Sequence, residues 1–571
     1  MRLRTAFGLS ILLTLVLGVF APGCKKKKDL VECDYALPQC PDGLVCQYQG
    51  FDLPAYCLDP CNPNDASTCD DYAATTCFGR VLGLFSCVPN CDVKSPVCPT
   101  GKICQPIGVG KSPVCLPPCD PKVADSCSAQ PGTTCERRTD GSYGCYTTVT
   151  LRGQVTDAIT GAPIGNARVI AADDTGAAAT NVAITDAEGN YTLQVPVTRE
   201  PDGTLAKGVF TLRVAAADYL PFPYGVRPAL PIDATKAVED GETHLLVLQN
   251  ATTDVTLLPL PDSELGRPSI SGHVVVTTPG QLPGGVLVVA EGAGDSTTLY
   301  GFADQSGSYV IFNVPAGSYT VRGYRVGIQL TPVPLSVADL DLVDVDLNES
   351  SKALATLSGK LSIVDASGSL ATSVVLIPKS LFNDVFKNGQ VPAGLRAPAP
   401  PEVPSIRGDY QIVGVPDGVY MVLAAFENDK LVRDPDPGIA GTQIREVTVD
   451  TTNGTAVTVP GEFKVTEALH VIAPGATEPE MVTGNPTFEF SDDSQQDGYY
   501  LYVYDAFGNK IWEKLDIGKI TGSDVVSVPY QGPALIPGMY YQFRVTSIFK
   551  GNPISNTEDL LGVFFLPLAT P

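Results

Sequence analysis

Cysteine offers the most varied chemistry in this sequence, because its thiol can form a disulfide, bind a metal ion or carry a lipid. The chain has 17 cysteines among 571 residues. One stands apart at position 24, and the other sixteen all precede residue 146. These are Cys33, Cys40, Cys46, Cys57, Cys61, Cys69, Cys77, Cys87, Cys91, Cys98, Cys104, Cys115, Cys119, Cys127, Cys135 and Cys145.

The spacing of the sixteen cysteines indicates a tandem duplication. Cys91 follows Cys33 by 58 residues (91 − 33 = 58), and the same offset holds for every later pair. Each set of eight divides again into two units of four cysteines, of about 28 residues each. We therefore expect two cysteine-rich repeats, at residues 33–90 and 91–147.

Such short units cannot bury enough apolar surface to fold alone, so disulfides or metal ions must stabilise them. Four cysteines could hold zinc, but no Cys-x-x-Cys pair and no histidine occurs in this block. We predict disulfides, each contributing about 2–4 kcal/mol, and neither a bound metal nor a cofactor. The pairing stays open, because four cysteines allow three pairings in each unit.

The charge of the chain argues against a nucleic-acid partner. The formal net charge is −24, and a field of that sign repels phosphate backbones. The basic run Lys25–Lys28 is the exception. It lies where lysines can attract anionic lipid headgroups.

An export signal occupies the N-terminus. Arg2 and Arg4 precede an apolar run of about 15 residues, which is shorter than the roughly 20 needed to cross a bilayer. The sequence that follows, residues 21–24, resembles a bacterial lipobox. The resemblance implies a signal peptide at 1–23, diacylglyceryl and acyl groups such as palmitate on Cys24, and a Lys-rich tether at 24–32. Lysine rather than aspartate at position 25, directly after the anchor, favours the outer membrane, on its surface or periplasmic face.

After residue 148 the sequence changes to alternating apolar and polar residues with many turn-forming residues, which is typical of β-strands. Three segments open with the pattern apolar-x-Gly-x-apolar, at residues 151–155, 270–274 and 357–361. Period-two spacing places the apolar ends and the glycine on one face, where a neighbouring backbone could approach closely. A Gly-x-Tyr turn follows each opening, at residues 189–191, 307–309 and 408–410.

These three segments resemble the carboxypeptidase regulatory-like domain. The first carries the resemblance most clearly, through residues 153–157, 160–164 and the turn at Asp186. The resemblance implies non-catalytic, transthyretin-like Greek-key β-sandwiches at 148–262, 263–350 and 351–462, the third divergent. It carries no sugar-binding site to this chain.

Residues 463–571 predict a fourth sandwich. The segment 535–545 is similar to the fibronectin type III signature. By that resemblance Tyr541 is the corner tyrosine, whose hydroxyl bonds the backbone a few residues upstream. We expect Trp512, the single tryptophan, to pack against strands.

The sequence offers few parts for an active site. His244, His273 and His470 fall in different modules, and the chain is not expected to be an enzyme. The run containing Asp339, Asp341, Asp344 and Asp346 predicts a strand with one wet face. Weak calcium binding there, or at the turn residues Asp186 and Asp304, remains an alternative.

We therefore expect an all-β, multidomain fold, with disulfide-rich small modules followed by tandem Greek-key β-sandwiches. The expected function is that of a non-catalytic, membrane-anchored surface lipoprotein for display, structural or adhesive interactions with a protein or glycan ligand. One alternative is a carbohydrate-binding surface protein. A second is an accessory subunit of an outer-membrane assembly.

Overall fold

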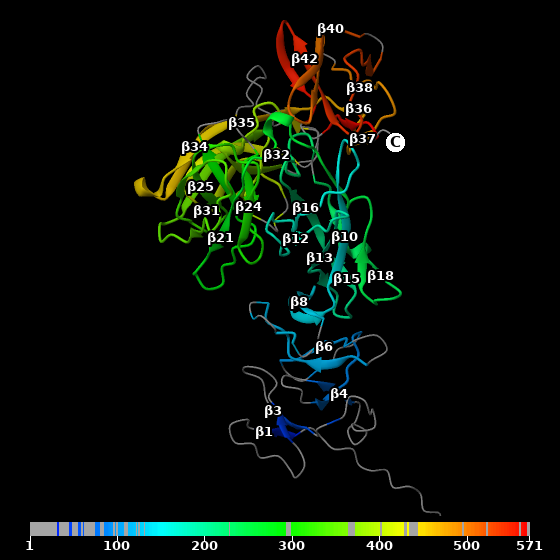
Figure 1. Ribbon diagram of the computed structural model, residues 1–571, viewed down its shortest axis with the longest axis vertical. Helices are drawn as coiled ribbons and strands as arrows, with labels where there is room; N and C mark the ends of the chain where they lie inside the picture. The colour runs from blue at the N-terminus through cyan, green and yellow to red at the C-terminus, as the bar shows by residue number, and fades with distance from the viewer. Residues whose placement is uncertain are drawn as a thin grey trace, which may run out of the picture. The chain divides into compact units, whose positions relative to one another are not determined.

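The computed structural model describes residues 132–567 with short gaps, together with short stretches between residues 31 and 130. The gaps in the longer range are 228, 293–297, 364–371, 400–401, 403, 427–430, 433–443, 494–495, 521–522 and 559–560. Cys24, the tether and the signal lie outside the described residues. The regular elements described are β-strands and 3-10 turns (Figure 1), which confirms the all-β fold class. None of the described elements is a helix long and apolar enough to cross a membrane.

The chain divides into two units, residues 1–146 with 200–204, and residues 147–199 with 205–571. The described strands of the first unit form one three-stranded sheet, in the order β1-β3-β2, and three two-stranded hairpins. The strands are β1 (Val31–Cys33), β2 (Val45–Gln47), β3 (Ala55–Leu58), β4 (Thr75–Gly79), β5 (Phe85–Pro89), β6 (Ile103–Gln105), β7 (Val114–Leu116), β8 (Thr134–Arg137) and β9 (Tyr143–Tyr146).

The second unit begins with a sandwich whose sheets run β13-β10-β19-β18, with β20 also on β10, and β12-β11-β16-β17. A separate hairpin joins β14 to β15. The elements are β10 (Val149–Asp157), β11 (Arg168–Ala172), β12 (Ala183–Ile184), β13 (Asn190–Val195), β14 (Thr198–Arg199), β15 (Leu205–Lys207), β16 (Val209–Ala215), β17 (Ile232–Asp233), η3 (Ala234–Lys236), β18 (Val238–Glu239), β19 (Leu246–Leu248) and β20 (Val255–Leu257).

The second sandwich has sheets β24-β21-β27 and β23-β22-β25-β26. Alternation along β21 buries Ile270, Gly272 and Val274 and leaves the residues between them more exposed, which is the period expected for a half-buried strand. The elements are η4 (Asp262–Glu264), β21 (Ile270–Val275), β22 (Leu287–Gly292), β23 (Tyr300–Phe302), β24 (Ser308–Ile311), β25 (Gly317–Tyr324), β26 (Val333–Val337) and β27 (Leu347–Asn348).

The third sandwich has sheets β31-β28-β35-β33 and β30-β29-β32-β34. Its last long strand, β35, runs past the boundary expected at residue 462. The elements are β28 (Ala355–Ile363), β29 (Thr372–Pro378), η5 (Lys379–Leu381), β30 (Arg396–Ala397), β31 (Asp409–Val415), β32 (Gly418–Phe426), β33 (Leu431–Val432), β34 (Arg445–Val449), η6 (Thr451–Asn453) and β35 (Ala456–Glu467).

The three sandwiches share one arrangement of their first strands. In each, the opening strand pairs antiparallel with the strand of the Gly-x-Tyr turn on one side, and parallel with the closing strand on the other. The antiparallel partners of β10, β21 and β28 are β13, β24 and β31. The parallel partners are β19 and β20 for β10, β27 for β21, and β35 for β28.

The C-terminal domain has sheets β36-β38-β41 and β37-β44-β42-β39-β40, with β43 on β42. Aromatic side chains dominate its core, where Phe488 and Phe543 are fully buried with ring centroids 4.7 Å apart. The strands are β36 (Val471–Ala473), β37 (Glu480–Met481), β38 (Thr487–Ser491), β39 (Gly498–Asp505), β40 (Lys510–Gly518), β41 (Val525–Pro529), β42 (Tyr540–Phe549), β43 (Asn552–Asn556) and β44 (Val563–Phe565).

Domains of the second unit contact one another through buried side chains. Tyr324 of the second sandwich packs edge-on against Tyr420 of the third, with ring centroids 5.7 Å apart. Asn313 of the second sandwich donates to the carbonyl of Tyr219 in the first, at 2.9 Å, and accepts from the amide of Asp218 at 2.7 Å. The first interface is therefore held by aromatic packing and the second by matched hydrogen bonds of a buried side chain, which gives each a defined geometry.

Candidate functional site

Each of the three related sandwiches places its opening glycine directly opposite the tyrosine of its Gly-x-Tyr turn. The pairs are Gly153 with Tyr191, Gly272 with Tyr309, and Gly359 with Tyr410. All three tyrosines are buried. Burial raises the pKa of each hydroxyl well above 10, so each stays protonated and able to donate a hydrogen bond at neutral pH.

In the first sandwich the backbone of the closing segment crosses over the opening glycine. Tyr191 donates to the carbonyl of Thr253 at 2.5 Å. A Cβ atom added to Gly153 would lie 2.1 Å from that same carbonyl oxygen. Only a residue without a side chain fits there, and the structure confirms the close backbone approach that the glycine predicts.

The second sandwich repeats this arrangement. Tyr309 donates to the carbonyl of Val345 at 2.5 Å, and a Cβ atom on Gly272 would lie 2.1 Å from the oxygen of that carbonyl. In both sandwiches, therefore, a crossing carbonyl fills the space above the opening glycine.

The third sandwich differs at this position. Its opening strand β28 pairs with β35 through Ser358 with Thr458 and then Lys360 with Glu462, so residues 459–461 stand opposite Gly359 alone. Such a register shift is a β-bulge, and it moves the extra residues away from the partner strand. The three atoms nearest to a Cβ on Gly359 belong to the Tyr410 side chain, with the hydroxyl oxygen at 2.2 Å, so the tyrosine rather than a crossing carbonyl fills this space. Gly461, with φ of 81°, adopts the left-handed conformation that the bulge requires.

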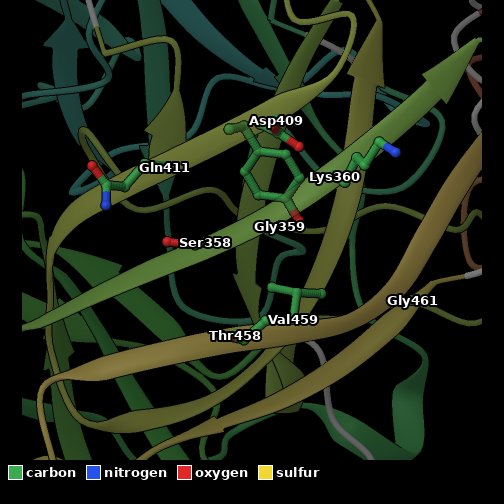
Figure 2. Close-up of a pocket in the computed structure, with 9 residues that line it drawn as sticks. Ser358, Gly359, Lys360, Asp409, Gln411, Thr458, Val459 and Gly461 are labelled. Carbon is green, nitrogen blue, oxygen red and sulfur yellow. The ribbon is translucent and has the colours of Figure 1, made fainter.

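An open groove of about 540 Å³ lies beside the bulge, on the outer face of the sheet. Figure 2 shows this groove, with β28 crossing it and β35 along its border. The lining residues are Ser358, Gly359, Lys360, Asp409, Tyr410, Gln411, Thr458, Val459 and Gly461.

Polar side chains form two rows across the groove. Gln411, Ser358 and Thr458 are register partners on β31, β28 and β35, and Lys360 lies opposite Asp409 on the neighbouring row. All but the half-buried Ser358 are exposed. Adjacent strands lie about 4.8 Å apart, so the three-residue row presents hydrogen-bonding groups at regular intervals. Opposite charges on facing strands also favour this register.

The aspartates of the Gly-x-Tyr turns accept hydrogen bonds from backbone amides. Asp186 accepts from Asn190 N at 2.7 Å. Asp304 accepts from Ser306 N at 2.9 Å and from Ser308 N at 3.0 Å. These are Asx turns, in which the carboxylate replaces a backbone acceptor.

Two carboxylates of the aspartate run also bond to the backbone of the opening strand region. Asp341 accepts from Ser269 N at 2.7 Å, and Asp346 accepts from His273 N at 2.9 Å. The carboxylates thus accept hydrogen bonds from backbone amides in and next to β21, where this strand lacks a continuous parallel partner. Asp344, between them, has φ of 57°.

Ten of the sixteen clustered cysteines form the disulfides that the structure describes. The five bonds lie in three of the four-cysteine units, and each joins the first cysteine of its unit to the third or the second to the fourth. The bonds are Cys61–Cys77, Cys91–Cys104, Cys98–Cys115, Cys119–Cys135 and Cys127–Cys145. Among the described residues, the groups of three or more potential metal ligands consist of these bonded cysteines, whose sulfurs carry no thiolate for a metal ion.

The bonds of the other six clustered cysteines, like Cys24, fall outside what the structure describes. Four pairs of strands nevertheless share one register. Cys46 lies opposite Cys57, and Cys77 lies opposite Cys87. The pairs Cys104 with Cys115 and Cys135 with Cys145 share this placement of the third and fourth cysteines.

In the C-terminal domain Tyr541 accepts a hydrogen bond from Ile536 N at 2.8 Å. The bond holds the turn before β42 against the strand. Trp512 is partly buried and packs against Tyr530, with ring centroids 5.1 Å apart. Its position is that of a packing residue on β40.

The three histidines stay in separate domains. His244 lies 2.8 Å from Glu239, and His273 lies 3.7 Å from Asp346, both exposed. The backbone amide of His470, in the C-terminal domain, donates to the hydroxyl of Ser491 at 2.9 Å. The described residues therefore do not bring the histidines together.

Sequence reasoning missed the groove residues Ser358, Gln411 and Thr458. A signal was present, since Pro460 and Gly461 fall within the closing strand, and this dipeptide is typical of a bulge or strand break. The sequence alone suggested a domain boundary there instead.

No family model matches this chain, and no curated protein matches it. Among solved structures, the Bacillus anthracis TIE protein matches with 10% identity over 70% of this chain and 66% of that chain, at a TM-score of 0.14. The minor pilin of Streptococcus agalactiae matches with 14% identity over 36% of this chain and 100% of that chain, at 0.16. A DUF3823 family protein from Bacteroides ovatus matches with 16% identity over 36% of this chain and 99% of that chain, at 0.15. Likenesses at these scores do not bear on the function of this chain.

Proposed function

We propose that this chain is a non-catalytic, lipid-anchored surface protein with a structural or adhesive role. The observation that carries the proposal is the series of disulfides in the first unit. Disulfides persist in oxidising compartments outside the cytosol. They agree with the export signal and with Cys24 as the site of lipid attachment.

The use of polar groups in the second unit supports a structural role. Turn and strand carboxylates such as Asp304 and Asp346 hold backbone amides. Asn313 fastens the second sandwich to the first by bonds to Tyr219 and Asp218. Carboxylate and amide side chains, which often serve in catalysis, thus hold the backbone in place. Interfaces fixed in this way suit a protein with a structural or adhesive role at a surface.

The anchor is tested by replacing Cys24 with alanine in the full chain. Without a thiol no lipid can be attached, so the Cys24→Ala variant should move from the membrane fraction to the soluble fraction in detergent phase partitioning. Lys26→Ala serves as the matched control and should stay with the membrane. Partitioning of Cys24→Ala into the detergent phase like wild type would contradict the anchor.

Display is tested separately, by treating intact cells with a protease. Surface display predicts that the second unit is cleaved on intact cells, whereas a periplasmic protein is cleaved only after the outer membrane has been permeabilised. An adhesive role predicts in addition that cells lacking the protein attach less to their substratum.

A further inference from the structure

The groove lies on the outer face of the third sandwich, beside the bulge at residues 459–461. It is separate from the space above Gly359, which faces inwards with Tyr410 and is filled by the side chain of that tyrosine: a Cβ atom on Gly359 would lie 2.2 Å from the Tyr410 hydroxyl oxygen.

The lining of the groove is rich in hydrogen-bonding groups. Gln411 offers an amide donor and acceptor, while Ser358 and Thr458 offer hydroxyls that serve as either. Lys360 and Asp409 contribute one charge of each sign, so the lining has no net formal charge. A volume of about 540 Å³ falls within the range of roughly 300–1,000 Å³ that is typical of small-molecule sites.

We propose that this groove binds a neutral saccharide. Sugars present closely spaced hydroxyls that donate and accept at once, which matches a row of amide and hydroxyl side chains repeated at about 4.8 Å across three strands. The balanced charges of Lys360 and Asp409 favour a neutral ligand over an anionic or cationic one. This binding activity goes beyond the structural role proposed above and does not depend on the lipid anchor.

The same lining disfavours a protein partner. Protein-binding hot spots are dominated by buried tryptophan, tyrosine and arginine anchors, whereas the aromatic ring at the groove, Tyr410, is only 5% exposed. Because that ring is not available for stacking, recognition must rely on hydrogen bonds. The ligand should therefore bind weakly, and its affinity should depend on individual polar side chains.

Isothermal titration calorimetry on the full-length chain tests this proposal. The probes are maltopentaose, cellopentaose, xylopentaose and N-acetylchitopentaose, with polygalacturonate as an anionic comparison. The protein is kept in a detergent without sugar headgroups, because a glycoside detergent would compete for the groove. We expect saturable binding of at least one neutral probe and none of polygalacturonate.

Two variants locate the binding. Gln411→Ala removes the central amide and should weaken binding by at least about tenfold, which corresponds to losing a hydrogen bond or two. Ser358→Tyr fills the groove and should abolish binding. The matched control is Thr192→Ala, because Thr192 follows Tyr191 as Gln411 follows Tyr410, on a different sandwich and outside the lining of the groove. It should leave the affinity within twofold of wild type.

The proposal fails if no neutral probe binds, if polygalacturonate binds more tightly than the neutral probes, or if folded Gln411→Ala binds as wild type does. Calorimetric unfolding checks that each variant is folded. Should Ser358→Tyr fail to fold, Gln411→Ala still decides. A negative result leaves the anchor and display experiments unaffected, since neither involves a saccharide.

Discussion

Tyr191 and Gly153 lie opposite each other on adjacent strands, and the tyrosine hydroxyl donates at 2.5 Å to the carbonyl of Thr253, which crosses over the glycine. Each of the three groups fixes the position of the other two. The glycine admits the carbonyl, the carbonyl accepts from the hydroxyl, and the buried hydroxyl is thereby satisfied.

Replacing Gly153 with alanine should destabilise the first sandwich. The new Cβ would lie 2.1 Å from the Thr253 oxygen, so the crossing segment must move and the hydrogen bond from Tyr191 must stretch. Overpacking of this kind costs about 1–3 kcal/mol. Differential scanning calorimetry of the full chain measures it, and the matched control is Gly241→Ala, where a Cβ meets nothing within 4 Å. Equal effects of the two substitutions would contradict the steric argument.

The carboxylate of Glu349 should make the second sandwich sensitive to acid. Hydrogen bonds from the Thr278 hydroxyl, the Thr277 amide and hydroxyl, and the Thr278 amide lower the pKa of Glu349 from 4.5 to about 2. The folded-state pKa is depressed, so the stabilisation is fully present above about pH 4.5 and is lost as the pH falls towards about 2.

Comparing wild type with Glu349→Gln tests this dependence. The difference in melting temperature should be largest above pH 4.5 and should shrink as the pH is lowered. The control Glu478→Gln, at an exposed position, should show no such trend. A difference between wild type and Glu349→Gln that stays constant from pH 6 to pH 2 would refute the assignment.

Asn313 should hold the first and second sandwiches together. Its side chain contacts the amide of Asp218 and the carbonyl of Tyr219, and only 9% of Asn313 is exposed. Asn313→Ala leaves these partly buried backbone groups without their side-chain partner, at a cost of up to about 1–3 kcal/mol for each unsatisfied group. Hydrogen exchange should therefore become faster at the Asp218 amide. Asn348→Ala, at an exposed position on β27, should leave that amide protected.

The disulfides should follow one pattern throughout the cysteine block. The five described bonds join first to third or second to fourth cysteines, and the duplication extends the pattern to Cys33–Cys46, Cys40–Cys57 and Cys69–Cys87. Peptide mapping under non-reducing conditions should recover these three linkages. Free thiols, or bonds between neighbouring cysteines such as Cys33 and Cys40, would contradict the prediction.

The strand character of the chain and the role of the opening glycines could be predicted, because both depend on local sequence. The alternation of apolar and polar residues predicts which side chains are buried. Gly153 and Gly272 predict positions at which a neighbouring backbone approaches too closely for a side chain. The groove could not be predicted in this way. Pro460 and Gly461 indicate a bulge in β35, but the sequence does not tell which residue of β28 lies opposite that bulge.

Contacts between domains were also beyond sequence reasoning. Asn313 follows an ordinary strand, and nothing in the residues around it indicates that its partners lie near residue 218. The hydrogen bonds of Asp341 and Asp346 form an intermediate case. Their alternation predicted one strand with a wet face, whereas in the structure the two side chains complete the hydrogen bonding of a neighbouring strand.

The parallel pairing of first and last strands has a mechanical consequence. In each of the three related sandwiches the chain enters along one strand and leaves along its parallel neighbour. A pull on the two ends drives these strands past each other lengthwise, so the hydrogen bonds between them bear the force together and must rupture as a group. Antiparallel terminal strands would instead peel apart one bond at a time. Tension along the chain therefore loads the terminal strands of each sandwich in shear, the direction in which they resist separation most strongly.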